Sequence, residues 1–373
     1  MDERRDDRQT SPGHGDRHGA RAVVIAGGGS GGHVFPGLAV ADVLLGRGCR
    51  VSWMGRPHGM ERELVLARGL GYDAVRARPL VGRGPSGRLL ALATLAPSGV
   101  RAALLLHRRR SVAVLGTGGY VCAPAVLGAT LGRIPAVLLE PNAHAGTANR
   151  WLSRRVRAAA VGHAATARDL ACPSRHTGVP VRAAFFDVPE ARPAARCRLL
   201  VLGGSQGAQD LNRALPVALA ALGRRGVAAR VLHQAGREHG ESTRRAWAEA
   251  AVPPSIEARV CGFVDDVAGA MADADLVVSR AGAITLAEVC AAGRASLLVP
   301  LSLAGGHQAD NAAELERAGA ARVAGADVEG LTARLAELLA RPELLVEMGR
   351  RARSLAKPRA AEEIADLVLE AAA

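Results

Sequence analysis

The first segment whose residues could bind a ligand is a glycine-rich stretch, GGGSGGHVFP, at residues 27–36. An apolar run at 22–26 precedes it and a helical pattern follows, which predicts a strand, a glycine loop and a helix. Free amides and the positive dipole end at such a helix start attract an anion, usually a phosphate. The spacing Gly27-x-Gly29-x-x-Gly32 also fits a dinucleotide fingerprint. A tight turn without a ligand is the alternative interpretation.

Two further glycine-rich turns also follow predicted strands. Ser205 and Gln206 lie in the turn at 203–207, where a hydroxyl and an amide beside free backbone N–H groups would form a neutral phosphate cradle. Ser205 would equally serve as a helix N-cap. Tyr120 ends the turn at 116–120, where it either holds a polar ligand or packs as a ring with a hydrogen-bonded hydroxyl.

A polar stretch at 279–288, SRAGAITLAE, follows another predicted strand and predicts a helix whose first amides face a ligand. The Glu288 carboxylate can accept two hydrogen bonds from a vicinal diol such as a ribose, or it can favour the helix dipole. Gln308 and Asn311, in the polar segment 301–311, are candidates to bind sugar hydroxyls. Asp310 is better interpreted as a helix cap.

Several enzyme classes are disfavoured by what the chain lacks. A dinucleotide dehydrogenase needs an acid about 20 residues after its glycines, where this chain has Met54-Gly55-Arg56. The sequence contains no P-loop, H-E-x-x-H or G-x-S-x-G motif, and no aspartate-rich triplet, so we expect no metal and no cofactor. The six cysteines are scattered singly, which indicates a reducing compartment.

Alternating strand and helix patterns run through the chain and predict a doubly wound α/β fold with parallel sheets. The pattern restarts after a Pro-, Ala- and Arg-rich linker at 180–195, so two domains should face each other across a cleft. The tail from residue 358 predicts an amphipathic helix. The predicted strands lie at 22–26, 50–54, 74–75, 112–115, 136–139, 158–161, 199–202, 229–233, 258–260, 276–278 and 296–299.

Charge is unevenly distributed along the chain, which has a formal net charge of +13. Between Asp73 and Asp169 the only acid is Glu140, among fourteen arginines. Such a basic face suits a polyanion or an anionic membrane surface. Residues 1–20 are polar, without a signal-peptide core, and the uncharged run at 111–132 is broken by glycines, so we expect a cytosolic protein without a membrane span.

Taken together, these motifs resemble the MurG family, whose members transfer N-acetylglucosamine (GlcNAc) from UDP-GlcNAc to the lipid-linked muramoyl-peptide of cell-wall synthesis. The resemblance extends over almost all of the chain after residue 20. The matching pieces are residues 28–36, 118–120, 140–142, 180–182, 203–208, 262–266, 279–288, 307–308 and Asn311.

The resemblance implies a GT-B fold: an N-terminal extension (1–20), an acceptor and membrane domain (21–182), a UDP-GlcNAc domain (183–357) and a terminal helix packing back on the first domain (358–373). It implies that Val264 backbone binds uracil, Glu288 the ribose, and Gln308 the GlcNAc hydroxyls, and that His33 or Glu140 is the catalytic base. The substrate-binding positions it implies are Ser30, Gly31, Gly32, Tyr120, Asn142, Arg182, Ser205, Gln206, Val264, Ala283, Ile284, Thr285, Leu286, Ala287, Glu288, His307, Gln308 and Asn311.

Three positions depart from the family pattern: Leu139 and Pro141 stand where the family has His and Gln, and Val179 where it has Asn. The expected partners are UDP-GlcNAc, a lipid-linked muramoyl-pentapeptide and the anionic inner leaflet, with no nucleic acid. A peripheral position on the cytoplasmic face follows from an apolar patch with a basic rim at 76–95. Two alternatives stay open: another GT-B enzyme with a lipid acceptor, such as a diacylglycerol glycosyltransferase, and a non-catalytic nucleotide-sugar-binding protein.

Overall fold

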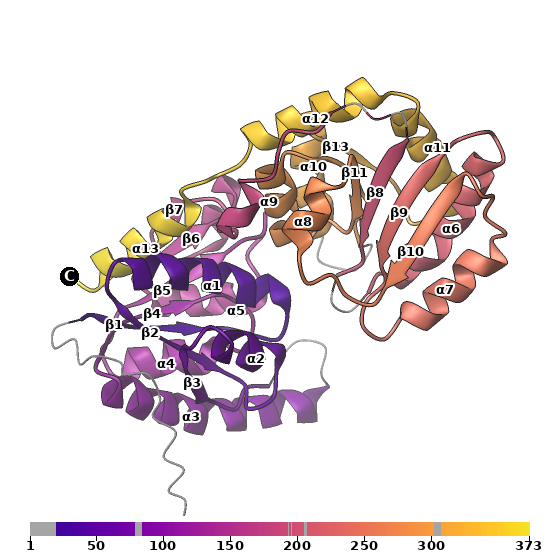
Figure 1. Cartoon of the computed structure of the whole chain (residues 1–373). Helices are drawn as coiled ribbons and strands as arrows, with labels where there is room; N and C mark the ends of the chain where they lie inside the picture. The colour runs from indigo at the N-terminus through magenta and orange to yellow at the C-terminus, as the bar shows by residue number, and fades with distance from the viewer. Residues whose placement is uncertain (1–19, 79–83, 193, 195, 205–206, 302–306) are drawn as a thin grey trace, which may run out of the picture.

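The computed structural model (Figure 1) describes residues 20–78, 84–192, 194, 196–204, 207–301 and 307–373. In these ranges the chain forms two parallel sheets, with strand orders β3-β2-β1-β4-β5-β6-β7 and β10-β9-β8-β11-β12-β13. Both orders reverse direction beside the first strand of the domain, the arrangement of a doubly wound Rossmann-like fold. The predicted α/β architecture of two parallel-sheet domains is therefore confirmed.

The first domain opens with the strand, glycine loop and helix that the sequence predicts. Its sheet is covered by α1 and the C-terminal helix on one face and by α3 and α4 on the other. The elements are β1 (Ala22–Ala26), α1 (Gly31–Gly46), β2 (Arg50–Gly55), α2 (Met60–Leu66), β3 (Gly71–Ala74), α3 (Pro85–Arg108), β4 (Ser111–Gly116), α4 (Ala123–Leu131), β5 (Ala136–Glu140), α5 (Thr147–Leu152), η1 (Ser153–Arg155), β6 (Ala158–Val161), η2 (Ala164–Asp169) and β7 (Ser174–His176).

The second domain repeats this arrangement. One face of its sheet packs on α6, α11 and α12, and the other on α8 and α9. The elements are η3 (Ala183–Phe185), β8 (Cys197–Leu202), α6 (Gln209–Gly223), β9 (Ala229–Gln234), α7 (Gly240–Glu249), β10 (Ile256–Cys261), α8 (Val267–Ala272), β11 (Leu276–Ser279), α9 (Ala283–Ala292), β12 (Ala295–Leu298), α10 (His307–Arg317), β13 (Ala321–Val323), α11 (Val328–Leu339) and α12 (Pro342–Ser354). The chain ends in α13 (Ala360–Ala371), outside this domain.

The last helix, α13, returns to the first domain and lies against α1 (Figure 1). Ile364 and Val368 are fully buried there, in the same core as Ile25 of β1 and Leu44 of α1. The chain between the sheets is also partly core, because Phe185 and Val188 pack with Leu200 in the second domain. The interpretation of 180–195 as a plain linker is therefore too broad.

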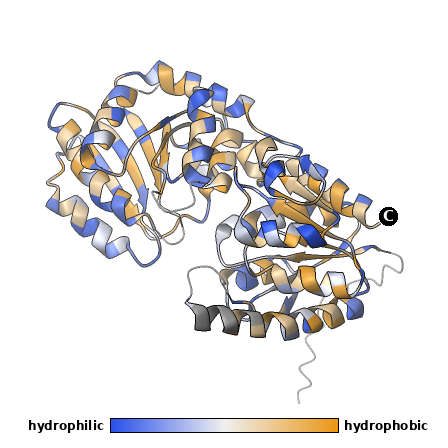
Figure 2. Cartoon of the chain, turned by 180° about the vertical axis from the view of Figure 1, so that it is seen from behind, coloured by the Kyte–Doolittle hydropathy of each residue, from blue (hydrophilic) through white to orange (hydrophobic). Residues whose placement is uncertain are grey.

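Figure 2 shows that the strands of both sheets are predominantly apolar, as expected when helices cover both faces of a parallel sheet. In the described part of the chain, no helix is long and apolar enough to cross a membrane. The expected N-terminal extension lies outside the described residues except for Ala20.

Candidate active site

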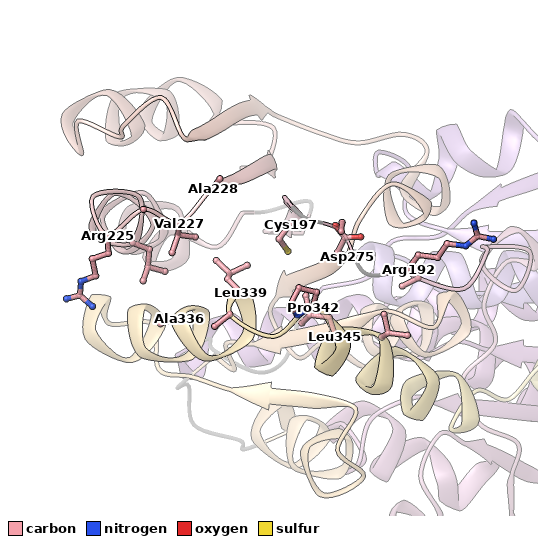
Figure 3. A pocket seen from close by; sticks show the side chains of 16 residues that line it. Arg192, Cys197, Arg225, Val227, Ala228, Asp275, Ala336, Leu339, Pro342 and Leu345 are labelled. Carbon is pink, nitrogen blue, oxygen red and sulfur yellow. The ribbon is translucent and has the colours of Figure 1, made fainter.

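A hollow of about 960 Å³ lies between the domains. It opens at the carboxyl ends of the strands in both sheets, where α/β folds bind ligands. A smaller cavity of about 400 Å³ (Figure 3) lies at the opposite end of the second sheet, beside Cys197 and Asp275. The interdomain cleft is therefore the candidate site.

Most of the predicted site residues converge on this cleft, although they come from segments far apart in the sequence. Ser205 and Gln206 lie outside the described residues, but their neighbours Gly204 and Gly207 line the cleft. The other predicted residues that line it are Ser30, Gly31, Gly32, His33, Asn142, Arg182, Val264, Ala283, Ile284, Thr285, Glu288 and Gln308.

The start of α9 offers free backbone donors to the cleft. Gly282 precedes the helix, and its carbonyl accepts the first helical hydrogen bond from the amide of Leu286 at 3.0 Å. The N–H groups of Ala283, Ile284 and Thr285 therefore have no acceptor within the helix. Three such amides and the helix dipole suit an anion such as a diphosphate.

Two of the predicted α9 positions do not line the cleft. Leu286 is buried in the core beside Ala281 and Cys290, and Ala287 also lies outside the lining. A helix turns 100° per residue and presents only one face to the cleft, so these two residues lie on the other face, and their substrate contacts stay a prediction.

Glu288 lies one turn further along α9, with 12% of its side chain exposed. Burial raises the pKa of Glu288 to about 7, and the Arg182 guanidinium, 3.8 Å away, only partly opposes that rise. As the sixth residue of α9, Glu288 is not an acid of the first helical turn. Among the described residues, no hydrogen-bond donor reaches the Glu288 carboxylate, which suits a diol.

His33 lies across the cleft, in the first turn of α1. Its Nδ1 is 3.0 Å from the carbonyl oxygen of Thr117, which can only accept, so Nδ1 carries the proton and Nε2 keeps its lone pair. Burial lowers the pKa of His33, outweighing the Thr117 carbonyl and Glu140, which raise it. The ring is therefore neutral and ready to accept a proton at Nε2.

Glu140, the other candidate base, has a different role. Its carboxylate is buried and accepts hydrogen bonds from Asn142 N and Nδ2, Gly146 N and Asn149 Nδ2, at 2.9–3.1 Å. We correct its assignment as a base, because four donors occupy its oxygens and it does not line the cleft. Glu140 instead fixes the loop that presents Asn142 to the cleft.

The prediction that Asn311 binds sugar hydroxyls is also corrected. Its side chain is fully buried and already forms hydrogen bonds across the domain boundary. Its Oδ1 accepts from the amide of Ala143 at 3.0 Å, and its Nδ2 donates to the carbonyl of Ala281 at 3.2 Å. Asp310 approaches His144 at 3.0 Å on the same side of α10, and Glu314 pairs with His163. These contacts join α10 to the first domain.

Replacing Asn311 by alanine should lower the free energy of unfolding by about 1–3 kcal/mol, because it leaves a buried N–H and a buried carbonyl unpaired. Chemical denaturation would measure this loss. The matched control is Asp310→Ala, whose exposed pair with His144 should contribute less than about 1 kcal/mol. Equal losses in both variants would contradict the role of Asn311 as a buried interdomain link.

The remaining predicted residues divide between the cleft and its surroundings. Gln308 lines the cleft, and its Oε1 accepts from the amide of Leu301 at 3.0 Å. His307 does not line it; its ring lies 6.0 Å from that of His144. Tyr120 also lies outside the lining, and its hydroxyl accepts from Arg56 Nη1 at 3.3 Å. Direct substrate contacts of His307 and Tyr120 stay a prediction.

The lining also includes residues that were not predicted, among them Arg237, Phe263 and Arg280. The Arg237 guanidinium lies 4.5 Å from the centre of the Phe263 ring, beside Val264. Arg280 donates to the carbonyl of Val299 at 3.1 Å. Arg237, Phe263 and Arg280 each follow closely after a strand, and that position was the available signal. Among the described residues, no group of three or more potential metal ligands occurs.

Sequence and structure comparisons agree with this geometry. Residues 23–161 match the glycosyltransferase family 28 N-terminal domain and residues 198–364 its C-terminal domain. The UDP-N-acetylglucosamine--N-acetylmuramyl-(pentapeptide) pyrophosphoryl-undecaprenol N-acetylglucosamine transferase of Stutzerimonas stutzeri is 44% identical over 363 residues, covering 95% of this chain and 99% of that protein. The protein of the same name from Azotobacter vinelandii is 43% identical over 365 residues, with coverages of 95% and 99%.

Two solved structures show the same arrangement of domains. The crystal structure of Acinetobacter baumannii MurG matches with a TM-score of 0.74 and 33% identity, covering 94% of this chain and 99% of that one. A UDP-GlcNAc 2-epimerase from Neisseria meningitidis, bound to UDP-GlcNAc, matches with a TM-score of 0.63 at 14% identity, covering 94% and 100%. The second likeness concerns the fold alone.

Proposed function

We infer that this chain, which belongs to the MurG family within glycosyltransferase family 28, transfers GlcNAc from UDP-GlcNAc to lipid-linked MurNAc-pentapeptide in peptidoglycan synthesis. The observation that carries the reaction type is the cleft itself. Free amides at the start of α9 and the Glu288 carboxylate line one wall, and the neutral His33 lines the other.

We propose that the donor lies along the second domain. Uracil would contact Phe263 and the Val264 backbone, the ribose hydroxyls would donate to Glu288, and the diphosphate would accept from the α9 amides. Gln308 would bind the GlcNAc hydroxyls. This order places the anomeric carbon toward His33 and Asn142, from the first domain.

The reaction is then a single displacement with inversion at the anomeric carbon. The acceptor hydroxyl oxygen forms the new glycosidic bond, the bond to the UDP oxygen breaks, and the hydroxyl proton passes to His33 Nε2. Negative charge develops on the departing diphosphate, where the α9 amides and the Arg182 guanidinium are placed to stabilise it. His33 is suited to its part because it is neutral with Nε2 unprotonated.

The direct test is incubation of the protein with labelled UDP-GlcNAc and a lipid-linked muramoyl-pentapeptide analogue. Transfer of the label to the analogue is expected. Transfer only to diacylglycerol would support a different lipid acceptor, and UDP-GlcNAc binding without turnover to any acceptor would support a nucleotide-sugar-binding protein. Either outcome would overturn the proposed function.

We further propose that the first domain docks peripherally on the anionic cytoplasmic leaflet through α3. Of the predicted patch, Leu80, Val81 and Arg83 lie outside the described residues, and Leu95 packs partly against the core. Among the α3 side chains that the structure describes, the large apolar residues Leu90, Val100 and Leu104 are exposed, by 50%, 54% and 59%. Their spacing places them on one side of a helix, with the exposed Arg101 and Arg108.

The double replacement Val100→Glu and Leu104→Glu should weaken binding to anionic vesicles by about tenfold or more, because it removes apolar contacts and adds charges that repel the surface. Cosedimentation with phosphatidylglycerol vesicles would measure it. The control is Val217→Glu in α6 of the second domain, an apolar residue with 42% exposure. Unchanged vesicle binding by the double variant would rule out docking through α3.

A further inference from the structure

A buried carboxylate already occupies the first glycine loop, where the sequence predicts a bound phosphate. Glu61, in the first turn of α2, is fully buried. Its Oε2 accepts from the amide of Gly29 at 3.3 Å, and its Oε1 accepts from Arg56 N at 3.3 Å and Arg56 Nε at 3.1 Å. The donors that would hold a phosphate at Gly29 are therefore bonded to the chain itself.

Two glycines beside this carboxylate make room for it, because a Cβ atom at either would collide with it. A Cβ atom at Gly28 would lie 2.4 Å from the carboxyl carbon of Glu61, and one at Gly59 would lie 2.4 Å from its Oε2. Gly29 has a φ of +90°, a conformation that L side chains rarely adopt. The carboxylate therefore accounts for the glycines at 28 and 59, and the backbone conformation accounts for Gly29.

The carboxylate is charged in this setting. Burial raises the pKa of Glu61, but hydrogen bonds from Arg56 and from backbone N–H groups, with the Arg56 charge, outweigh burial and hold that pKa below its usual value. The loop therefore contains a resident anion, paired with one arginine.

Arg56 extends this contact to the third glycine turn. Its Nη1 donates to the Tyr120 hydroxyl at 3.3 Å, and its backbone carbonyl accepts from the Tyr72 hydroxyl at 2.7 Å. Next to Tyr120, the backbone of Gly119 packs so tightly on His33 that a Cβ atom there would lie 3.1 Å from Nε2. Glu61 and Arg56 thus join the two loops that hold the His33 ring.

We propose that Glu61 is a positioning residue: its carboxylate is the permanent anion of the first glycine loop and sets the geometry in which His33 meets the acceptor. The proposal rests on the proposed transferase function. In this proposal, the substrate phosphates bind to the amides at the starts of α1 and α9, which line the cleft.

The experiment compares Glu61→Ala and Glu61→Gln with wild type in kcat, in the Kd for UDP and in the melting temperature. Both variants should lose about tenfold in kcat through misplacement of the base. The Kd for UDP should change by less than about twofold, because the donor site is on the other domain. Glu61→Gln keeps the volume of the side chain, so it is informative even if Glu61→Ala folds poorly.

Added acetate tests the resident anion directly. In Glu61→Ala it should fill the vacated space, raise the melting temperature saturably and restore part of kcat, whereas chloride at equal ionic strength should not. This thermal shift should be absent in wild type and in Glu329→Ala, a control that removes an exposed acid from the first turn of α11. Because the thermal shift needs no turnover, it tests the anion site even if wild type transfers no GlcNAc.

Three results would overturn the proposal: wild-type kcat in both variants, a loss of UDP affinity equal to the loss of kcat, or the absence of any acetate effect on Glu61→Ala. The second result would assign Glu61 to general folding. The third would show that the loop has no specific need for an anion.

Discussion

Replacing His33 by alanine should lower kcat by about 10²–10⁴-fold and change the Kd for UDP little, because a positioned general base acts on the chemical step. The hydrogen bond from Nδ1 to the Thr117 carbonyl leaves Nε2 as the proton acceptor. Single-turnover transfer rates and calorimetric titration with UDP would separate the two effects. His58→Ala is the matched control, since His58 is exposed and does not line the cleft.

The pH dependence gives a second measure of the same role. Because burial lowers the pKa of His33 below its ordinary value, wild-type turnover should be retained through neutral pH and lost only below the usual titration range of histidine. Loss occurs on the acid side because the imidazolium cannot accept a proton. A small fall in kcat for His33→Ala, together with a clear fall in melting temperature, would instead indicate a purely structural histidine.

Replacing Glu288 by glutamine should raise the Kd for UDP by between about tenfold and 100-fold, because two charge-assisted hydrogen bonds from the ribose are lost. The pKa of about 7 adds a pH effect: below pH 7 the wild-type carboxyl must release its proton before binding, so its affinity should fall, whereas the variant has no such step. Calorimetry across pH 5.5–8.5 would measure both. The control ligand is 2′,3′-dideoxy-UDP, for which the two proteins should differ little.

The same substitution should stabilise the unliganded protein at high pH. The folded pKa of Glu288 lies above its ordinary value of 4.5, so between these two values the folded state binds more protons than the unfolded state, and stability falls as pH rises. Glutamine removes that loss, so the variant should gain about 1–3 kcal/mol above pH 7 and nothing near pH 4.5. Equal weakening of UDP and the dideoxy analogue, with no pH-dependent gain, would place Glu288 outside the ribose site.

The sequence alone determined the domain architecture. Continuous apolar runs such as 22–26 and 158–161 became β1 and β6 with the predicted bounds, because strands buried on both faces need apolar side chains at every position. The short strands β7 and β13 were not predicted. Each has only three residues and includes an arginine, as short strands at a sheet edge can. The strand predicted at 74–75 lies at Gly71–Ala74. Its polar residues Tyr72 and Asp73 interrupt the apolar run by which the other strands were predicted.

The sequence also identified which segments supply the cleft, because residues after parallel strands gather at one edge of a sheet. Only the tertiary structure decided what each side chain does there. The partner of Gly29 is a carboxylate 32 residues away, and the partner of Asn311 is an amide 168 residues away. Motif spacing cannot show that Glu140 and Asn311 already have hydrogen-bond partners, whereas no donor among the described residues reaches Glu288. Long-range packing fixes both burial and hydrogen-bond partners, and these separate a ligand-binding residue from one that holds the fold.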